Sequence, residues 1–138
     1  MSIFSVIGIA GTGATVYRKW LDAVSDNMAN LDTVRPTSEA AFQARFVVAN
    51  AIGNGQEAMT GGPAGAQVTG ISFGDANGRL MHDPSNPLAD ADGMVRFPDI
   101  DMGEQMTQLM IAQRGYQANL AVIDRAKDAY QQALSIGR

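Results

Sequence analysis

Apolar residues at the N-terminal end of the chain recur at intervals that alternate between four and three positions. The repeat begins at Ile3 and continues through Ile7, Ala10, Ala14, Tyr17, Leu21, Val24, Met28 and Leu31. This spacing predicts a helix with one apolar seam, of the kind that pairs with another helix in a coiled coil. Asp22 and Asp26 fall off the seam, as a solvent-facing or partner-facing side requires. We name these apolar positions the N-terminal seam.

Three glycines weaken the start of this predicted helix, namely Gly8, Gly11 and Gly13. Each costs roughly 1 kcal/mol of helix stability relative to alanine. We therefore expect the residues before Thr12 to become ordered only against a partner surface. The signals that stop the helix follow at Asn30, Asp32 and Pro36.

A second, longer seam with the same alternation lies near the C-terminal end. Its positions are Met102, Met106, Leu109, Gln113, Tyr116, Leu120, Ile123, Lys127, Tyr130 and Leu134. Asp101 precedes it as a helix N-cap, Glu104 follows as a first-turn acid, and Gly137 stands where the helix would stop. The pattern predicts a helix over residues 101–136, roughly 50 Å long at about 1.5 Å per residue.

Between the two helices the pattern changes to short extended segments. Residues 45–52 and 67–73 have strand composition, and the glycine-rich segment 53–65 would join them as a mobile hairpin tip. Residues 75–104 carry seven acidic residues and three prolines, so we expect them to be extended rather than helical.

These patterns predict a mainly α fold. Two long terminal helices would pack as an antiparallel coiled-coil-like pair, with a small β-hairpin and an extended loop region between them. We expect one axial domain formed by both ends of the chain, from a helical segment at 1–35 and a helix at 101–138, with 36–100 between them.

Composition narrows the possible functions. The 138-residue chain has a net charge of -4 and a pI near 4.7, which argues against nucleic-acid binding. It contains no cysteine and a single histidine, His82, so Cys-ligated metals, thiol catalysis and a His cluster within one chain are not expected. No apolar run is long enough to span a membrane, and no basic segment precedes the first one, so we expect neither membrane integration nor a Sec signal peptide.

Two short motifs suggest ligand chemistry, and neither is complete. Residues 3–16 could be a strand leading into a Gly11–Gly13 turn, as in a dinucleotide-binding unit, but the third glycine position holds Val16. Asp90, Asp92 and Gly93 fit part of a calcium loop, which then has Leu88 first and Asp99 twelfth; a solvated acidic turn fits better. Ser85, His82 and Asp83 are too close in sequence to form a catalytic triad. We predict no catalytic residues, no cofactor and no metal site.

Two sequence blocks resemble flagellar axial proteins. Ala29, Asn30 and Thr33 match the ANxxT motif of rod, hook and filament proteins, and residues 83–138 resemble the C-terminal half of the FlgC family of basal-body rod proteins. That family's DP-x-HP-x-AD-x-x-GYV pattern falls on Asp83, Pro84, Pro87, Ala89, Asp90, Gly93 and Val95. Its EM-x-x-M…R-x-YQAN core falls on Glu104, Met106, Leu109 or Met110, Arg114, Tyr116, Gln117, Ala118 and Asn119.

Some positions depart from the family pattern: Asn86 replaces the usual His, Met94 the usual Tyr, and Asp99 and Asp101 stand where Asn is frequent. The related FlgB family of proximal-rod proteins has the same architecture but lacks the DP-containing block. That block favours FlgC over FlgB. The helical pattern would also fit a generic coiled-coil adaptor and, more remotely, the glycine turn would fit a small dinucleotide-binding protein.

The resemblance implies a structural, non-enzymatic subunit of the flagellar proximal rod. Such proteins are exported by the flagellar type III apparatus and polymerise into a helical tube in the periplasm that transmits motor torque. The implied partners are further copies of the chain, other proximal-rod proteins, the rod-base adapter FliE and the distal rod. The expected assembly interface comprises the N-terminal seam and the C-terminal residues Met102, Met106, Leu109, Tyr116, Gln117, Ala118, Asn119, Leu120, Ile123 and Leu134.

Overall fold

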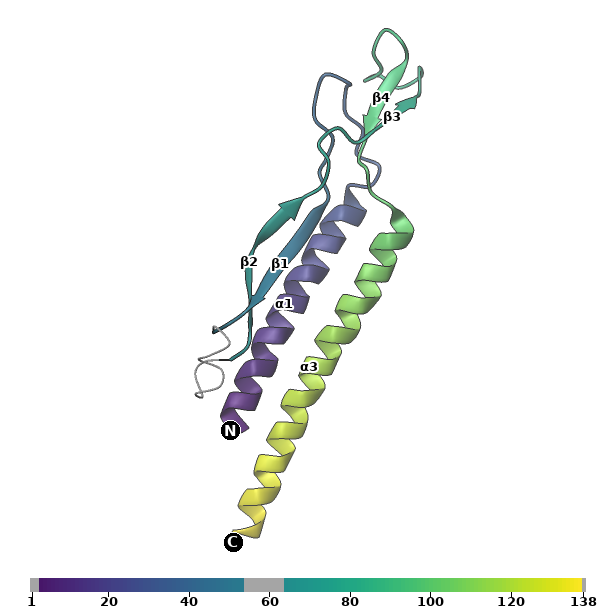
Figure 1. The fold of residues 1–138 in the computed structure, drawn as a ribbon. Helices are drawn as coiled ribbons and strands as arrows, with labels where there is room; N and C mark the ends of the chain where they lie inside the picture. Colours follow the sequence, from purple (N-terminus) through teal and green to yellow (C-terminus); the bar gives the residue numbers. More distant parts are fainter. Residues whose placement is uncertain (1–2, 54–63, 138) are drawn as a thin grey trace. The chain divides into compact units, whose positions relative to one another are not determined.

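A computed structural model describes residues 3–53 and 64–137. Two long helices, α1 (Ile3–Ala29) and α3 (Met102–Ile136), enclose four short strands in the sequence (Figure 1). The strands are β1 (Arg45–Ala51), β2 (Ala66–Phe73), β3 (Arg79–His82) and β4 (Met94–Phe97). The mainly α prediction with two terminal helices is confirmed, and the two first strands lie within one residue of their predicted bounds. Most of the predicted hairpin tip, residues 54–63, lies outside the described residues.

The chain forms two compact units. Unit 1 comprises Met1–Leu21, Val48–Gly70 and Met110–Arg138, and unit 2 comprises Asp22–Val47 and Ile71–Leu109. Both helices and the β1–β2 hairpin therefore contribute to each unit. In unit 1, α1 and α3 run antiparallel, because Phe4 meets Tyr130 near one end and Tyr17 meets Gly115 further along.

Helix α1 begins at Ile3, and the expectation that the residues before Thr12 become ordered only against a partner surface stays a prediction. Helix α3 of the same chain contacts this segment: the Phe4 and Tyr130 rings lie edge to face, with centroids 5.8 Å apart. At the other end of the chain, Glu104 N donates to Asp101 Oδ1 at 2.7 Å, which confirms the predicted N-cap of α3.

Strands β3 and β4 form an antiparallel hairpin in unit 2, from Arg79 opposite Phe97 to His82 opposite Met94. The sequence predicted only an extended segment here. Arg35 adds an antiparallel bridge on the other side of Arg96, with both N–O distances at 2.9 Å. Val95 is fully buried and Ile100 and Ala41 nearly so, which places the core of unit 2 beneath this hairpin.

Candidate assembly surface

Small residues form the contact between α1 and α3 in unit 1. Ala10 and Ala14 are buried on α1, and Ala112 and Ala126 are buried on α3. A Cβ atom added at Gly13 would lie 2.5 Å from Asn119 Oδ1, and one added at Gly115 would overlap the Tyr17 ring. Each helix thus contributes one glycine, against which a larger side chain of the other helix rests. We call these four residues (Gly13, Tyr17, Gly115 and Asn119) the glycine interlock.

The N-terminal seam packs against other residues of the same chain. Ala10, Ala14 and Val24 are buried, and the other members, Ile3, Ile7, Tyr17, Leu21, Met28 and Leu31, are half-buried. Within one chain, these positions therefore support intramolecular packing. Two further residues of this side, Ala23 and Asn27, are also buried and do not belong to the predicted repeat.

The predicted C-terminal seam coincides only partly with the buried side of α3. The buried residues of that helix are Gln105, Ala112 and Ala126, with half-buried Asn119 completing the same seven-residue spacing. Leu109, Tyr116 and Ile123 are half-buried beside this stripe. Met106, Gln113, Leu120 and Lys127 each come one residue after a member of it and are exposed. One residue turns a helix by about 100°, so these four positions point away from the buried stripe.

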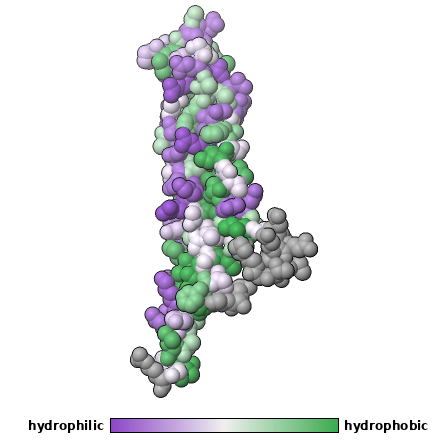
Figure 2. Space-filling model, turned by 90° about the vertical axis from the view of Figure 1, so that its left-hand side faces the viewer, coloured by the Kyte–Doolittle hydropathy of each residue, from purple (hydrophilic) through white to green (hydrophobic). Residues whose placement is uncertain are grey.

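Large apolar side chains remain exposed along α3. Their exposed fractions run from 39% for Leu120 to 86% for Ile136. The set, which we call the outer face, extends over more than one side of the helix, and one member, Tyr130, also contacts Phe4 of α1. Its members are Met102, Met106, Met110, Ile111, Leu120, Val122, Tyr130, Leu134 and Ile136. Gln117 and Ala118 of the predicted interface are exposed as well. Phe46, Ile71 and Phe73 add exposed apolar area on the β1–β2 hairpin. Figure 2, which views one face of the molecule, shows hydrophobic residues reaching the surface between hydrophilic ones. An unpaired apolar surface of this extent is typical of a protein that binds other chains.

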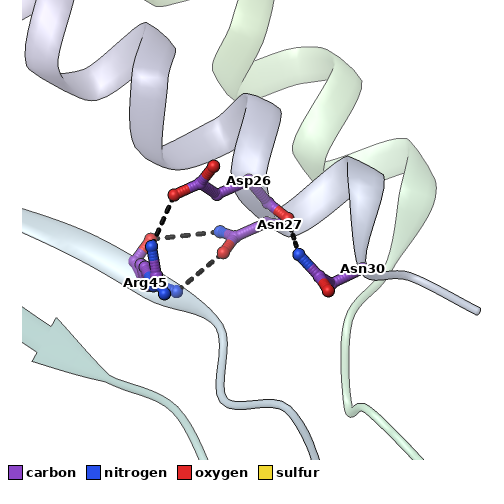
Figure 3. Close-up of polar contacts among 4 residues, drawn as sticks. All are labelled: Asp26, Asn27, Asn30 and Arg45. Carbon is purple, nitrogen blue, oxygen red and sulfur yellow. Dashed lines mark hydrogen bonds and ion pairs between the residues drawn. The ribbon is translucent and has the colours of Figure 1, made fainter. Parts of the chain in front are cut away.

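A polar contact joins the two helices in unit 2. Asn27 and Gln105 are 1% and 3% exposed, and Asn27 Nδ2 donates to Gln105 Oε1 at 3.0 Å. The same amide also engages the start of β1: its Nδ2 donates to Arg45 O at 3.0 Å, and its Oδ1 accepts from Arg45 N at 2.7 Å (Figure 3). The Arg45 guanidinium donates to Asp26. We call Asn27, Gln105 and the Arg45 backbone the amide node.

The ANxxT residues end α1. Asn30 Nδ2 donates to Asp26 O at 2.8 Å, and Thr33 Oγ1 donates to Asn30 Oδ1 at 3.1 Å (the first of these is drawn in Figure 3). Ala29 is the last residue of the helix. The Asn30 side chain therefore gives the Asp26 carbonyl a second donor beside the Asn30 backbone N–H, which bonds to the same oxygen at 3.2 Å. Its position explains the motif as a helix terminator.

The DP-containing block forms the connection between β3 and β4. The Asp83 carboxylate accepts from Ser85 Oγ at 2.7 Å and from Asn86 Nδ2 at 3.4 Å, and these bonds lower the pKa of Asp83. Gly93 has a φ of +72°, and a Cβ there would lie 3.0 Å from Pro84. The block therefore has a local structural role, in which Asp83 organises the turn and glycine is required at 93.

Asp90 holds the second part of the same connection. Its Oδ1 accepts from the amide nitrogens of Met94 and Asp92, and its Oδ2 accepts from Thr37 Oγ1 at 2.8 Å. The Met94 amide, followed by Thr37, lowers the pKa of Asp90. The carboxylate that a calcium loop would use as a ligand is thus engaged by the chain's own donors.

The dinucleotide-binding hypothesis is wrong in its structural premise. Residues 3–16 belong to α1, so no strand leads into a turn at Gly11 and Gly13. Among residues 3–53 and 64–137, no group of three or more His, Cys, Asp and Glu side chains is arranged to hold a metal ion. In the same part of the chain, no helix combines the length and apolar character that crossing a membrane requires.

Comparison with known proteins relates the sequence to one family. Residues 91–136 match the family described as the C-terminal region of the flagellar basal-body rod proteins FlgEFG. Over the full length of both chains, the sequence is 32% identical to the flagellar basal-body rod protein FlgC of Escherichia coli O6:H1 across 138 residues and 35% identical to that of Yersinia enterocolitica across 139. It is 29% identical to the Bacillus subtilis protein of the same name across 150 residues, again over both full lengths.

Two terminal helices with an exposed apolar face, together with these matches, define an axial component of the bacterial flagellum. The chain belongs to the FlgC family of flagellar basal-body rod proteins. It is a structural subunit of the rod, and its location is the flagellar basal body.

Proposed function

We propose that the chain is a proximal-rod subunit that polymerises through the outer face of α3 into a helical shaft transmitting motor torque. One observation carries the proposal: nine large apolar residues of one helix are 39% or more exposed in the described chain. At about 25 cal/mol per Å² of apolar area removed from water, covering such a face strongly favours association. Each subunit would contact its neighbours through two different surfaces. Repeating such a contact builds an open-ended helical filament.

Several further properties form part of the same proposal. The subunit is non-enzymatic, and the shaft lies in the periplasm, which the chain reaches through the flagellar type III apparatus without a Sec signal peptide. Its partners are other copies, the other proximal-rod proteins, the adapter FliE and the distal rod. Both ends of the chain build the axial domain, with the N-terminal seam contributing through its packing against α3.

Leu120→Asp tests the outer face. Leu120 is 39% exposed, so a carboxylate there stays hydrated in the free chain and we expect unfolding stability within about 0.5 kcal/mol of the original. In an assembled rod the same carboxylate would be buried without a counter-charge, which costs several kcal/mol. We therefore expect the variant to be made and exported, but cells to lack rods and to be non-motile.

Asp128→Asn is the matched control, because it also changes the charge by one unit at an exposed position of α3. Rod yield in basal-body preparations and spreading in soft agar should match the original for this variant. Normal rods built from the Leu120→Asp subunit would contradict the assignment of the outer face. Circular dichroism and urea unfolding of both purified variants separate a failure of assembly from a failure of folding.

A further inference from the structure

We propose that the glycine interlock fixes the register of α1 against α3 and thereby sets where along the helix pair the outer face of α3 is presented. The proposal rests on the proposed function only in its second clause, because the register is a property of the single chain. Gly13 and Tyr17 are four residues apart on α1, and Gly115 and Asn119 are four residues apart on α3. In an antiparallel pair this spacing places each glycine opposite the larger side chain of the other helix.

The ring of Tyr17 rests on Gly115 of α3, a position that has room for it because it carries no side chain. A Cβ at residue 115 would overlap three ring carbons of Tyr17, the farthest of them at 2.7 Å, which is closer than real Cβ contacts come. Unit 1 contains residues 110–136 of α3, and Gly115 is the only glycine among them. A slip of one turn would set the ring against Ile111 or Asn119 instead. The Tyr17 ring is also stacked on Trp20, with centroids 5.9 Å apart, which limits its freedom to move aside.

Asn119 supplies the reciprocal contact. Its Nδ2 donates to Gly115 O at 2.8 Å, so the amide is held against its own helix while its Oδ1 lies over Gly13. Gly8 and Gly11 have nothing within 4 Å of where a Cβ would be. Of the three glycines in α1, therefore, only Gly13 lies close against a side chain of α3. This contact gives Asn119, which the sequence placed in the assembly interface, a position inside the helix pair.

The register sets the position of the outer face along α1, because a slip of one turn keeps the same side of α3 inside and moves that helix along its axis. With Gly115 under Tyr17, Ala112 and Ala126 lie inside, and Leu120 and Val122 remain exposed. A slip of one turn would give each of these side chains a different partner on α1 and would move the outer face by about 5.4 Å along the helix pair. The amide node opposes slipping as well, since both helices continue into unit 2, so a test of the interlock must remove the node.

Disulfide trapping measures the register directly, because the chain contains no cysteine of its own. Phe4→Cys with Tyr130→Cys is the pair that represents the observed register, since the rings at these positions face each other across the helix pair. Its disulfide yield in the chain with Tyr17, Asn27 and Gln105 unchanged is the reference for every other pair. Phe4→Cys with Ala126→Cys, or with Leu134→Cys, reports a slip of one turn in either direction. All three pairs are introduced into a full-length chain that carries Asn27→Leu and Gln105→Leu, and each is compared with and without Tyr17→Ala.

We expect only the 4–130 disulfide while Tyr17 is present, and both slipped and 4–130 disulfides after Tyr17→Ala. Slipped disulfides with Tyr17 in place would overturn the proposal, since the interlock would not suffice to hold the register. An unchanged 4–130 preference after Tyr17→Ala would overturn it too. These readouts need no rod, so they fail independently of the proposed function.

Alanine substitutions in the otherwise unchanged chain give a second test. Gly115→Ala should lower the thermal midpoint and reduce the yield of the 4–130 disulfide. Gly11→Ala should raise the midpoint and leave the yield unchanged, because its Cβ enters open space on a helix. Equal midpoints and equal yields for the two variants would contradict a specific role for Gly115.

Discussion

The two units join the same pair of helices by different physical means. In unit 1 the contact is one of shape, with Tyr17 and Asn119 resting on glycines between buried alanines. In unit 2 it is one of hydrogen bonding, through the Asn27 and Gln105 amides. Shape excludes wrong registers by steric overlap, whereas a buried amide excludes them by leaving donors and acceptors unsatisfied. The difference predicts different responses to substitution.

The largest effect is expected where a charge enters the close-packed contact of unit 1. Ala112 is fully buried, and Ala112→Asp should lower the free energy of unfolding by at least about 3 kcal/mol, because an unpaired carboxylate has no hydration there. Ala118→Asp makes the same chemical change at an exposed position of the same helix and should cost no more than about 0.5 kcal/mol. Urea unfolding measures both, and similar values would contradict the placement of α3.

Removing one amide of unit 2 should have the next largest effect. Asn27→Leu leaves Arg45 N–H and the Gln105 amide without their buried partner, which should cost about 2–3 kcal/mol. Replacing both amides by Leu should cost less than the sum of the single changes, because the pair then disappears together. A double-mutant cycle by urea unfolding gives the coupling, and strict additivity would show that the two amides do not act as a pair.

A single hydroxyl should have a smaller effect. Thr12 Oγ1 accepts from Ala66 N at 3.1 Å and so links α1 to the start of β2 in unit 1. Thr12→Val preserves the shape and should cost about 1 kcal/mol. The Thr15 hydroxyl donates to Gly11 O of its own helix, and Thr15→Val should change the stability by less. A larger loss of stability for Thr15→Val than for Thr12→Val would show that the hydrogen bond to β2 contributes nothing.

The smallest effect is expected in the β3–β4 connection, where the response depends on pH. The pKa of Asp90 is lowered in the folded chain by the Met94 amide and Thr37, so its contribution to stability is present at neutral pH. That contribution decreases as the pH falls below the ordinary aspartate pKa of about 4 and is lost below the folded value. Asp90→Asn should therefore flatten the acid side of the stability curve, whereas Asp92→Asn on the same connection serves as the control. Thermal midpoints of both variants and of the original chain, measured between pH 2 and 7, test this expectation.

Much of the fold follows from repeats and end signals in the sequence. The N-terminal seam, the Asp101 cap and both strands of the first hairpin were predicted because each depends on near neighbours in the chain. The β3–β4 hairpin was missed because three prolines in this segment argued against regular structure and each strand has only four residues. Gly78 and Gly93, both at positive φ, directly precede the two strands.

The buried stripe of α3 could not be read from apolar periodicity. Its members are Gln105, Asn119 and two alanines, whereas Met106 and Leu120, each one position after a member, are exposed. A hydrophobic repeat identifies residues that avoid water and does not say whether the same chain or another covers them. The missing signal was a pair of glycines, Gly13 and Gly115, each followed four positions later by a larger residue, Tyr17 and Asn119 respectively.

The amide node can form only late in the synthesis of the chain. Asn27 and Gln105 are 78 residues apart, and the helices that they join lie at opposite ends of the chain. Contacts between distant residues must overcome the entropy of closing a long loop, and none can form before the second partner exists. While the ribosome is still making the segment after Phe97, α1 has been synthesised but its seam has no α3 to cover it. The growing chain therefore carries an uncovered apolar stripe for most of its synthesis.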